Sequence, residues 1–149
     1  MIKDERNYHQ RLQEFCDCFM ETDFKKELEM ASKGVSGDPS GDPDELALKF
    51  FGVTLLYGAN EEAKKISLQR SREGKVSLSV EARGSYQLPA PSVQVAHRIF
   101  SIARSITHIE KDQGKSLLSL GLRNDRMEIF LEFDRKGGRE SLTIIFPKS

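Results

Sequence analysis

Histidine exchanges protons most readily near neutral pH, so the three histidines of this 149-residue chain are the first candidates for acid–base catalysis. His97 and His108 lie on one expected helix, where a rise of 1.5 Å per residue separates them by about 16 Å, too far to share a metal ion. Their side of that helix is opposite its apolar face, which predicts a solvated surface. His9 has no acid or nucleophile in a recognisable motif beside it. We therefore expect no catalytic histidine.

The two cysteines, Cys16 and Cys18, are the next candidates. Within one regular helix, positions two apart point about 200° away from each other, so these thiols cannot form a disulfide there. A structural zinc site needs a second pair of Cys or His ligands, which the spacing does not supply. Cys16 falls on an apolar stripe and is expected in the core, while Cys18 is expected at the surface. A nucleophilic role for Cys18 would need a base that the fold delivers from elsewhere.

A short Gly-Lys-Ser run at 114–116 is similar to the end of a phosphate-binding P-loop. The motif also requires a glycine five residues before Gly114, and that position holds Ile109. It further requires a strand before the loop and a helix after it, whereas here a helix is expected first and a strand second. The run is therefore interpreted as an ordinary turn from helix to strand.

Four acidic residues close together raise the question of a calcium site. An EF-hand loop that began at the first of them would need Gly at its sixth position and Glu at its twelfth, but Pro43 and Lys49 stand there. Helix capping explains the same acids without a metal, and a calcium loop of another type stays an alternative. We expect no metal site and no cofactor. The four acids are Asp38, Asp42, Asp44 and Glu45.

The formal net charge is zero, from 23 basic and 23 acidic residues, which disfavours a broadly basic nucleic-acid binder. The charge is unevenly distributed, because residues 1–45 hold 12 acidic and 6 basic groups, while residues 64–83 hold six basic and two acidic ones. The basic segment is a candidate for an anionic ligand or a nucleic-acid backbone. Edge-strand protection and packing against the acidic N-terminal helices are the alternatives. The candidate anion-binding residues are Lys65, Arg70, Arg72, Lys75 and Arg83.

Apolar residues in steps of three and four predict a helix over residues 4–20 that continues to 33 with a break near residue 22, where Thr22-Asp23 offers a cap. Gly and Pro residues make 34–43 a loop. The next helix, from about 43 to 57, is apolar nearly all round and should be the central buried helix. A further amphipathic helix is expected from about 91 to 109.

Alternation of apolar and polar residues predicts the strands. Two alternating runs over 64–82, separated by a turn that contains Gly74, predict a β-hairpin, and three strands near 116–123, 126–134 and 140–146 form a meander. The fold is therefore expected to be α+β: two N-terminal helical segments, then ββαβββ, with a five-stranded antiparallel sheet packed against helices. The ββαβββ order is similar to that of profilin-like and roadblock-type modules, many of which are adaptors or dimerisation platforms. We expect one domain, with residues 1–33 helical, 34–43 a loop and 44–149 the α+β core.

Three large apolar residues are expected on the face of the meander that points away from the helices. They are Leu117, Phe130 and Ile145. An apolar patch on a wet face indicates a covered surface. The N-terminal helix of the same chain or a second subunit could cover it, and both alternatives stay open.

These patterns favour a non-catalytic binding or regulatory module that self-associates, with a homodimer or another protein as its partner. The first alternative is an anionic-ligand or nucleic-acid binder that uses hairpin 64–83, and the second is a small enzyme whose pocket combines distant residues. The charged start of the chain predicts no signal peptide, and no apolar run is long enough to span a membrane. The expected location is therefore the cytoplasm, without a membrane partner.

Overall fold

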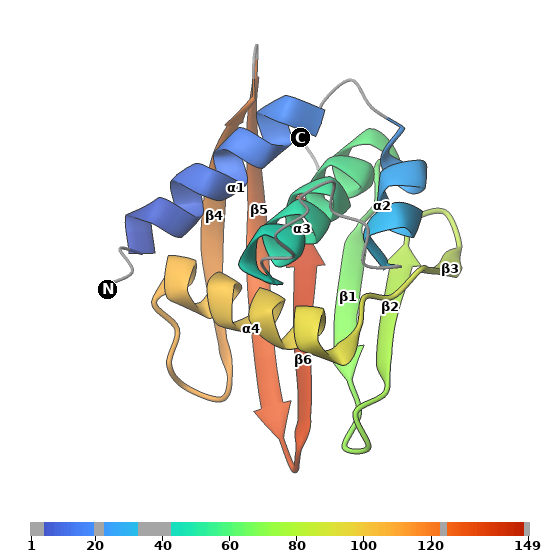
Figure 1. The fold of residues 1–149 in the computed structure, drawn as a ribbon, viewed down its shortest axis with the longest axis vertical. Helices are drawn as coiled ribbons and strands as arrows, with labels where there is room; N and C mark the ends of the chain where they lie inside the picture. Colours follow the sequence, from blue (N-terminus) through green and yellow to red (C-terminus); the bar gives the residue numbers. More distant parts are fainter. Residues whose placement is uncertain (1–4, 20–22, 33–42, 123–124, 148–149) are drawn as a thin grey trace.

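The protein is an antiparallel sheet with all its described helices on one face, as seen in a computed structural model that describes residues 5–19, 23–32, 43–122 and 125–147 (Figure 1). The helices are α1 (Glu5–Phe19), α2 (Phe24–Ser32), α3 (Pro43–Asn60) and α4 (Val93–Thr107). The strands are β1 (Lys65–Arg70), β2 (Val76–Glu81), β3 (Ser85–Leu88), β4 (Gly114–Leu122), β5 (Asp125–Lys136) and β6 (Arg139–Ile145). They lie in the order β3-β2-β1-β6-β5-β4, with every neighbouring pair antiparallel.

The α+β class is confirmed, but the sheet has six strands and not the expected five. The additional strand is β3, which pairs with β2 so that Leu88 lies opposite Leu78. β3 has four residues, of which only Leu88 is buried, so its alternation is too short to be recognised as a strand. The core order is therefore βββαβββ, and the similarity in element order that rested on two strands before the helix does not hold.

The N-terminal helical segment consists of two helices, α1 and α2. Asp23 caps α2 as expected, because its Oδ1 accepts a hydrogen bond from the backbone N–H of Lys26 at 3.2 Å. The predicted loop at 34–43 lies outside the described residues, apart from Pro43, where α3 begins.

The core lies between α3 and the sheet. The expectation of a central buried helix is confirmed, since α1, α2 and α4 all pack against α3, whose side chains from Ala47 to Tyr57 are buried. Ile66 and Leu68 of β1 face the same core, which also receives the apolar alternation of the other strands. The predicted core residues of the meander are confirmed where they are described: Leu118, Leu120, Met127, Ile129, Leu131, Phe133, Leu142 and Ile144 are buried, and Phe146 packs against them.

The opposite face of the sheet, here called the open face, carries none of the described helices (Figure 1). α1 packs on α3, α4 and β4 on the other side. Of the two alternatives for covering the reverse face, cover by the N-terminal helix is therefore wrong for the described residues. The reason is that α1 buries Leu12 and Cys16 in the main core, where a larger apolar surface is available than on the open face. Among the described helices, none is both long enough and apolar enough to cross a membrane.

Candidate functional site

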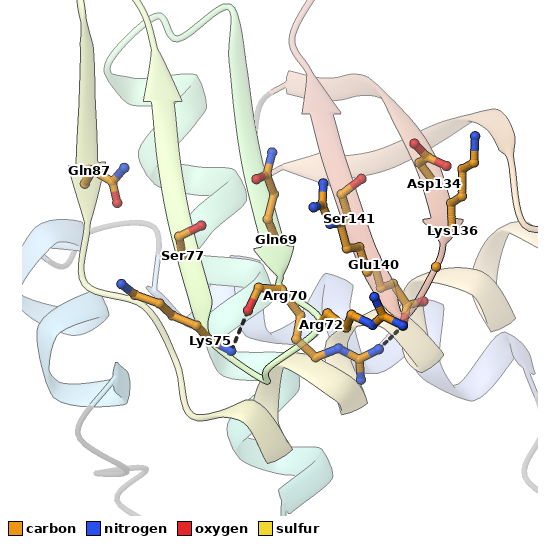
Figure 2. Close-up of a pocket in the computed structure, with 13 residues that line it drawn as sticks. Gln69, Arg70, Arg72, Lys75, Ser77, Gln87, Asp134, Lys136, Glu140 and Ser141 are labelled. Carbon is orange, nitrogen blue, oxygen red and sulfur yellow. Dashed lines mark hydrogen bonds and ion pairs between the residues drawn. The ribbon is translucent and has the colours of Figure 1, made fainter.

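A broad depression of about 950 Å³ lies at the end of the sheet where the β1–β2 and β5–β6 hairpins turn. Figure 2 shows Lys75 on one side of it and Lys136 on the other, with Arg70 and Arg72 between them. We call it the basic depression, because five cations and two carboxylates line it and leave a formal charge of +3. The charged residues are Arg70, Arg72, Lys75, Lys136, Arg139, Asp134 and Glu140.

The first hairpin carries three of these cations on a tight turn that follows from its sequence. The backbone N–H of Ser71 donates to the carbonyl of Lys75 at 2.8 Å, and the Ser71 hydroxyl accepts from the N–H of Lys75 at 3.0 Å. Gly74 adopts a φ of 87°, which costs a side-chain-bearing residue about 1 kcal/mol or more. The turn therefore holds Arg72 and Lys75 at the hairpin tip.

The second hairpin brings its cations to the same place. Gly137 and Gly138 have φ values of 59° and 82°, which suits a two-residue turn between paired Lys136 and Arg139. The two hairpin tips meet, because a Cβ on Gly138 would lie 3.2 Å from Cγ of Arg72. The aliphatic part of Arg72 thus rests on the second turn.

Most of these cations have no partner among the residues that the structure describes. The side chains of Arg72, Lys75, Lys136 and Arg139 form no ion pair or hydrogen bond with another described residue. Arg70 has one distant counter-charge, with Nη2 3.9 Å from Oε1 of Glu140, and its buried Nε has no acceptor among the described residues. Unpaired cations that face each other repel, so an anion that enters this depression relieves the repulsion.

Three cations on the helices are paired with the acidic N-terminal part of the chain. Lys49 of α3 lies 3.1 Å from Glu27, Arg98 of α4 donates to Asp44, and Arg11 pairs with Glu45. These three acids of residues 1–45 are thus paired with cations on helices, and not with the cations of the first hairpin. These ion pairs give no support to the alternative in which the acidic N-terminal helices pack against the basic hairpin, because α1 and α2 pack against α3.

The buried carboxylate of Glu140 contacts two arginines at the depression. Glu140, 7% exposed, has Oε2 3.4 Å from Nε of Arg104, in addition to its contact with Arg70. Arg104 is itself held by the carbonyls of Lys111 and Asp112, at 2.6 and 3.2 Å, and lies over the ring of Phe133. Arg104 therefore holds Glu140 in place, and Glu140 lies between Arg104 and Arg70 as their shared counter-charge.

Neutral hydrogen-bonding side chains complete the lining. Gln69, Ser77, Gln87 and Ser141 project from four adjacent strands on the open face (Figure 2). No aromatic, histidine or cysteine side chain lines the depression among the described residues. The described lining therefore offers charged groups and hydrogen-bonding groups.

The structure brings together three of the five candidate anion-binding residues, namely Arg70, Arg72 and Lys75. Lys65 instead lies in mid-sheet, between Glu81 and Ile145. Arg83 lines a smaller depression of about 560 Å³ at the other end of the first hairpin, together with Lys64 and Tyr86. Lys136 and Arg139 were not predicted as part of the site. Their one sequence signal is that they stand on either side of a Gly-Gly turn.

The structure also places the other residues that the sequence offered as candidates for chemistry. Cys16 is buried with Sγ 3.8 Å from the carbonyl oxygen of Gly52, as expected for a core residue, and the side chain of Cys18 is outside what the structure describes. His97 is exposed, and His108 ends α4 as its C-cap with a φ of 58°. Gly114 and Lys115 belong to β4, so the P-loop order is absent. Within the described ranges, no three metal-ligating side chains come together.

The smaller depression adjoins one group with an altered pKa, because Tyr86 in its lining is hydrogen-bonded to Tyr57. The hydroxyl groups of Tyr57 and Tyr86 lie 2.8 Å apart. Burial, and then this hydrogen bond, raise the pKa of Tyr57 well above its ordinary value. A tyrosine held in its neutral form donates a hydrogen bond and does not act as a base.

The three reverse-face residues form a continuous row on the open face. Leu117 is paired with Phe130, and Phe130 with Ile145, on neighbouring strands. Leu117 is 51% exposed, and Nζ of Lys115 lies 5.0 Å from the centre of the Phe130 ring. The predicted apolar patch therefore exists as one row across β4, β5 and β6.

Comparisons with models of protein families and with curated proteins give no match for this sequence. The function is therefore argued from the site. Two features of the open face carry that argument: the cations that collect from two hairpins, and the apolar row beside them.

Proposed function

We propose that this protein is a non-catalytic binding module whose ligand is a small anion-bearing molecule held in the basic depression. The observation that carries the proposal is the gathering of five cations, from hairpins more than 60 residues apart in the chain, around a single concavity. Four of these side chains have no counter-charge among the described residues. Arginine matches phosphate and carboxylate oxygens with two parallel hydrogen bonds, so Arg70, Arg72 and Arg139 suit an oxyanion best.

Because the chain as a whole has no net charge, its attraction for an anion comes from the local charge of the depression. Charges separated by more than about 8–10 Å are screened at physiological salt, so the depression acts mainly on ligands that enter it. This favours a compact anion over a long polyanion that needs contacts along the whole surface. The free buried thiol of Cys16 agrees with the reducing cytoplasm, where we place the protein.

The test compares two triple variants that remove equal charge. Replacing Arg72, Lys75 and Lys136 with Gln neutralises the depression, and replacing Lys64, Lys65 and Arg83 with Gln removes three exposed cations elsewhere. Calorimetric titration with inorganic tripolyphosphate should show binding by the wild type and the second variant, and at least a ten-fold loss in the first. An equal loss in both variants, or no binding by the wild type at low salt, would contradict the proposal.

Self-association through the open face is a second candidate, favoured by the row of Leu117, Phe130 and Ile145. The occupant we propose is a second copy of the chain. Around the row, Lys115 and Arg126 stand beside Glu128 and Glu132, so two copies related by a two-fold axis can oppose unlike charges. The patch is thus complementary to itself.

Sedimentation equilibrium tests this second candidate. Leu117→Glu should weaken the dimer at least ten-fold, because it buries a charge within the contact. Val93→Glu is the matched control, since Val93 is another exposed apolar residue, 43% exposed, on the helical side. A strictly monomeric wild type, or equal effects of both substitutions, would remove the candidate.

A further inference from the structure

The placement of the cations limits how many charged groups the ligand has. Lys75 precedes β2 and Lys136 ends β5, with β1 and β6 between these strands. Three strand spacings of about 4.8 Å separate the two sides by about 14 Å. One phosphate group can contact two or three neighbouring cations but does not reach both sides of such a span. The depression therefore suits a molecule with two or more anionic groups.

The side chains between the two groups of cations form the floor of the depression, and they limit the chemistry of the part of the ligand that joins its anionic groups. Gln69, Ser77 and Ser141 lie on the three central strands β1, β2 and β6 (Figure 2). Their amide and hydroxyl groups both donate and accept hydrogen bonds. Asp134, at the rim, accepts hydrogen bonds from hydroxyl groups and repels additional anionic groups. Such a floor recognises an uncharged, hydroxyl-rich framework.

The same lining disfavours nucleobases. Proteins hold the bases of single strands by stacking them on aromatic rings. The described lining has no ring, and Phe130, on the same face, is not part of it. A nucleic-acid strand would thus gain its phosphate contacts here without its base contacts.

We propose that the basic depression binds a sugar or polyol that carries at least two phosphate groups. One phosphate lies between Arg70, Arg72 and Lys75, the other lies near Lys136 and Arg139, and the hydroxyl groups lie on the floor of Gln69, Ser77 and Ser141. This inference rests on the proposed function and adds the nature of the framework that joins the anionic groups.

Matched bisphosphates separate the inference from the function on which it rests. Fructose 1,6-bisphosphate and hexane-1,6-diol bisphosphate both carry two terminal phosphates, and only the first carries hydroxyl groups between them. By calorimetry, the wild type should bind the sugar bisphosphate about ten-fold more tightly, since one or two additional net hydrogen bonds at about 1 kcal/mol each give this ratio. Ser77→Ala with Ser141→Ala should reduce that ratio toward one, with little effect on the diol bisphosphate.

The other outcomes of this experiment separate a failure of the inference from a failure of the proposed function. Equal affinity for the two bisphosphates would overturn the inference and leave the anion-binding function standing. Tighter binding of an oligothymidylate than of either bisphosphate would overturn it in favour of nucleic acid. If neither bisphosphate nor tripolyphosphate binds, both the inference and the proposed function fail. A preference for inositol 1,4-bisphosphate over the sugar, again lost in the double variant, would support the inference for a cyclic polyol.

Discussion

The side-chain amide of Gln13 in α1 forms a two-way hydrogen-bonded pair with the backbone of Gly121 in β4. Its Oε1 accepts from the N–H of Gly121 at 2.7 Å, and its Nε2 donates to the Gly121 carbonyl. His9 adds a contact between Nε2 and the carbonyl oxygen of Ser119 at 3.0 Å. Because β4 is the last strand of the sheet, these backbone groups would otherwise be open to another strand. The amide therefore takes the place of a neighbouring strand and protects the edge.

Gln13→Ala should lower the free energy of unfolding by about 1 kcal/mol and promote association at the β4 edge, because two backbone groups lose their partner. Urea denaturation and light scattering at rising protein concentration measure the two effects. Gln10→Ala is the control, since Gln10 is exposed on the same helix and its one side-chain hydrogen bond among the described residues is to Glu14, at 3.5 Å. Equal behaviour of the two variants would show that the Gln13 pair does not protect the edge.

Glu140→Gln should destabilise the protein by about 3 kcal/mol, because it leaves the largely buried Arg104 and its neighbour Arg70 without their shared counter-charge. Chemical denaturation gives the value directly. Glu128→Gln, which removes an exposed partner of Arg126 at 3.4 Å, should cost less than about 1 kcal/mol. If Glu140→Gln is as mild as Glu128→Gln, the network beneath the depression is not a structural support.

Because the pKa of Tyr57 is raised, the folded protein should lose stability at alkaline pH. This pKa is raised in the folded state chiefly by burial, whereas a tyrosine in the unfolded chain ionises at about pH 10. The stabilisation is thus complete below pH 10 and is lost as the pH rises above it, because the unfolded state releases its proton first. Denaturation midpoints between pH 8 and 11 should fall less steeply in Tyr57→Phe than in the wild type. Parallel curves for the two proteins would contradict this.

Gly58→Ala should destabilise the protein by about 2 kcal/mol, because the end of α3 touches the sheet there. An added Cβ would lie 2.2 Å from Cζ of Phe146 and 2.9 Å from Cδ1 of Ile66. Gly84→Ala is the control, since a Cβ at Gly84 meets nothing within 4 Å. Thermal unfolding should show a clear fall in Tm for the first variant and almost none for the second. Comparable Tm values would mean that the Phe146 ring moves aside at little cost.

Local sequence patterns determined most elements and the direction in which their side chains point. The alternation in β5 places Ile129 in the core and Phe130 on the open face, and the structure agrees at both positions. The all-round apolar helix at 43–57 is α3, the central helix. These features depend on periods of 2 and 3.6 residues, which are properties of neighbouring residues and can be read without the fold.

Tertiary structure alone decided which elements lie together. β1 pairs with β6, more than 70 residues later in the chain, and this pairing brings Arg72 against Gly138 and adds Lys136 and Arg139 to the site. The position of α1 over the β4 edge likewise depends on contacts of Leu12 and Gln13 with distant elements. Periodicity carries no information about such partners, because many arrangements bury the same apolar faces, and only long-range packing selects one.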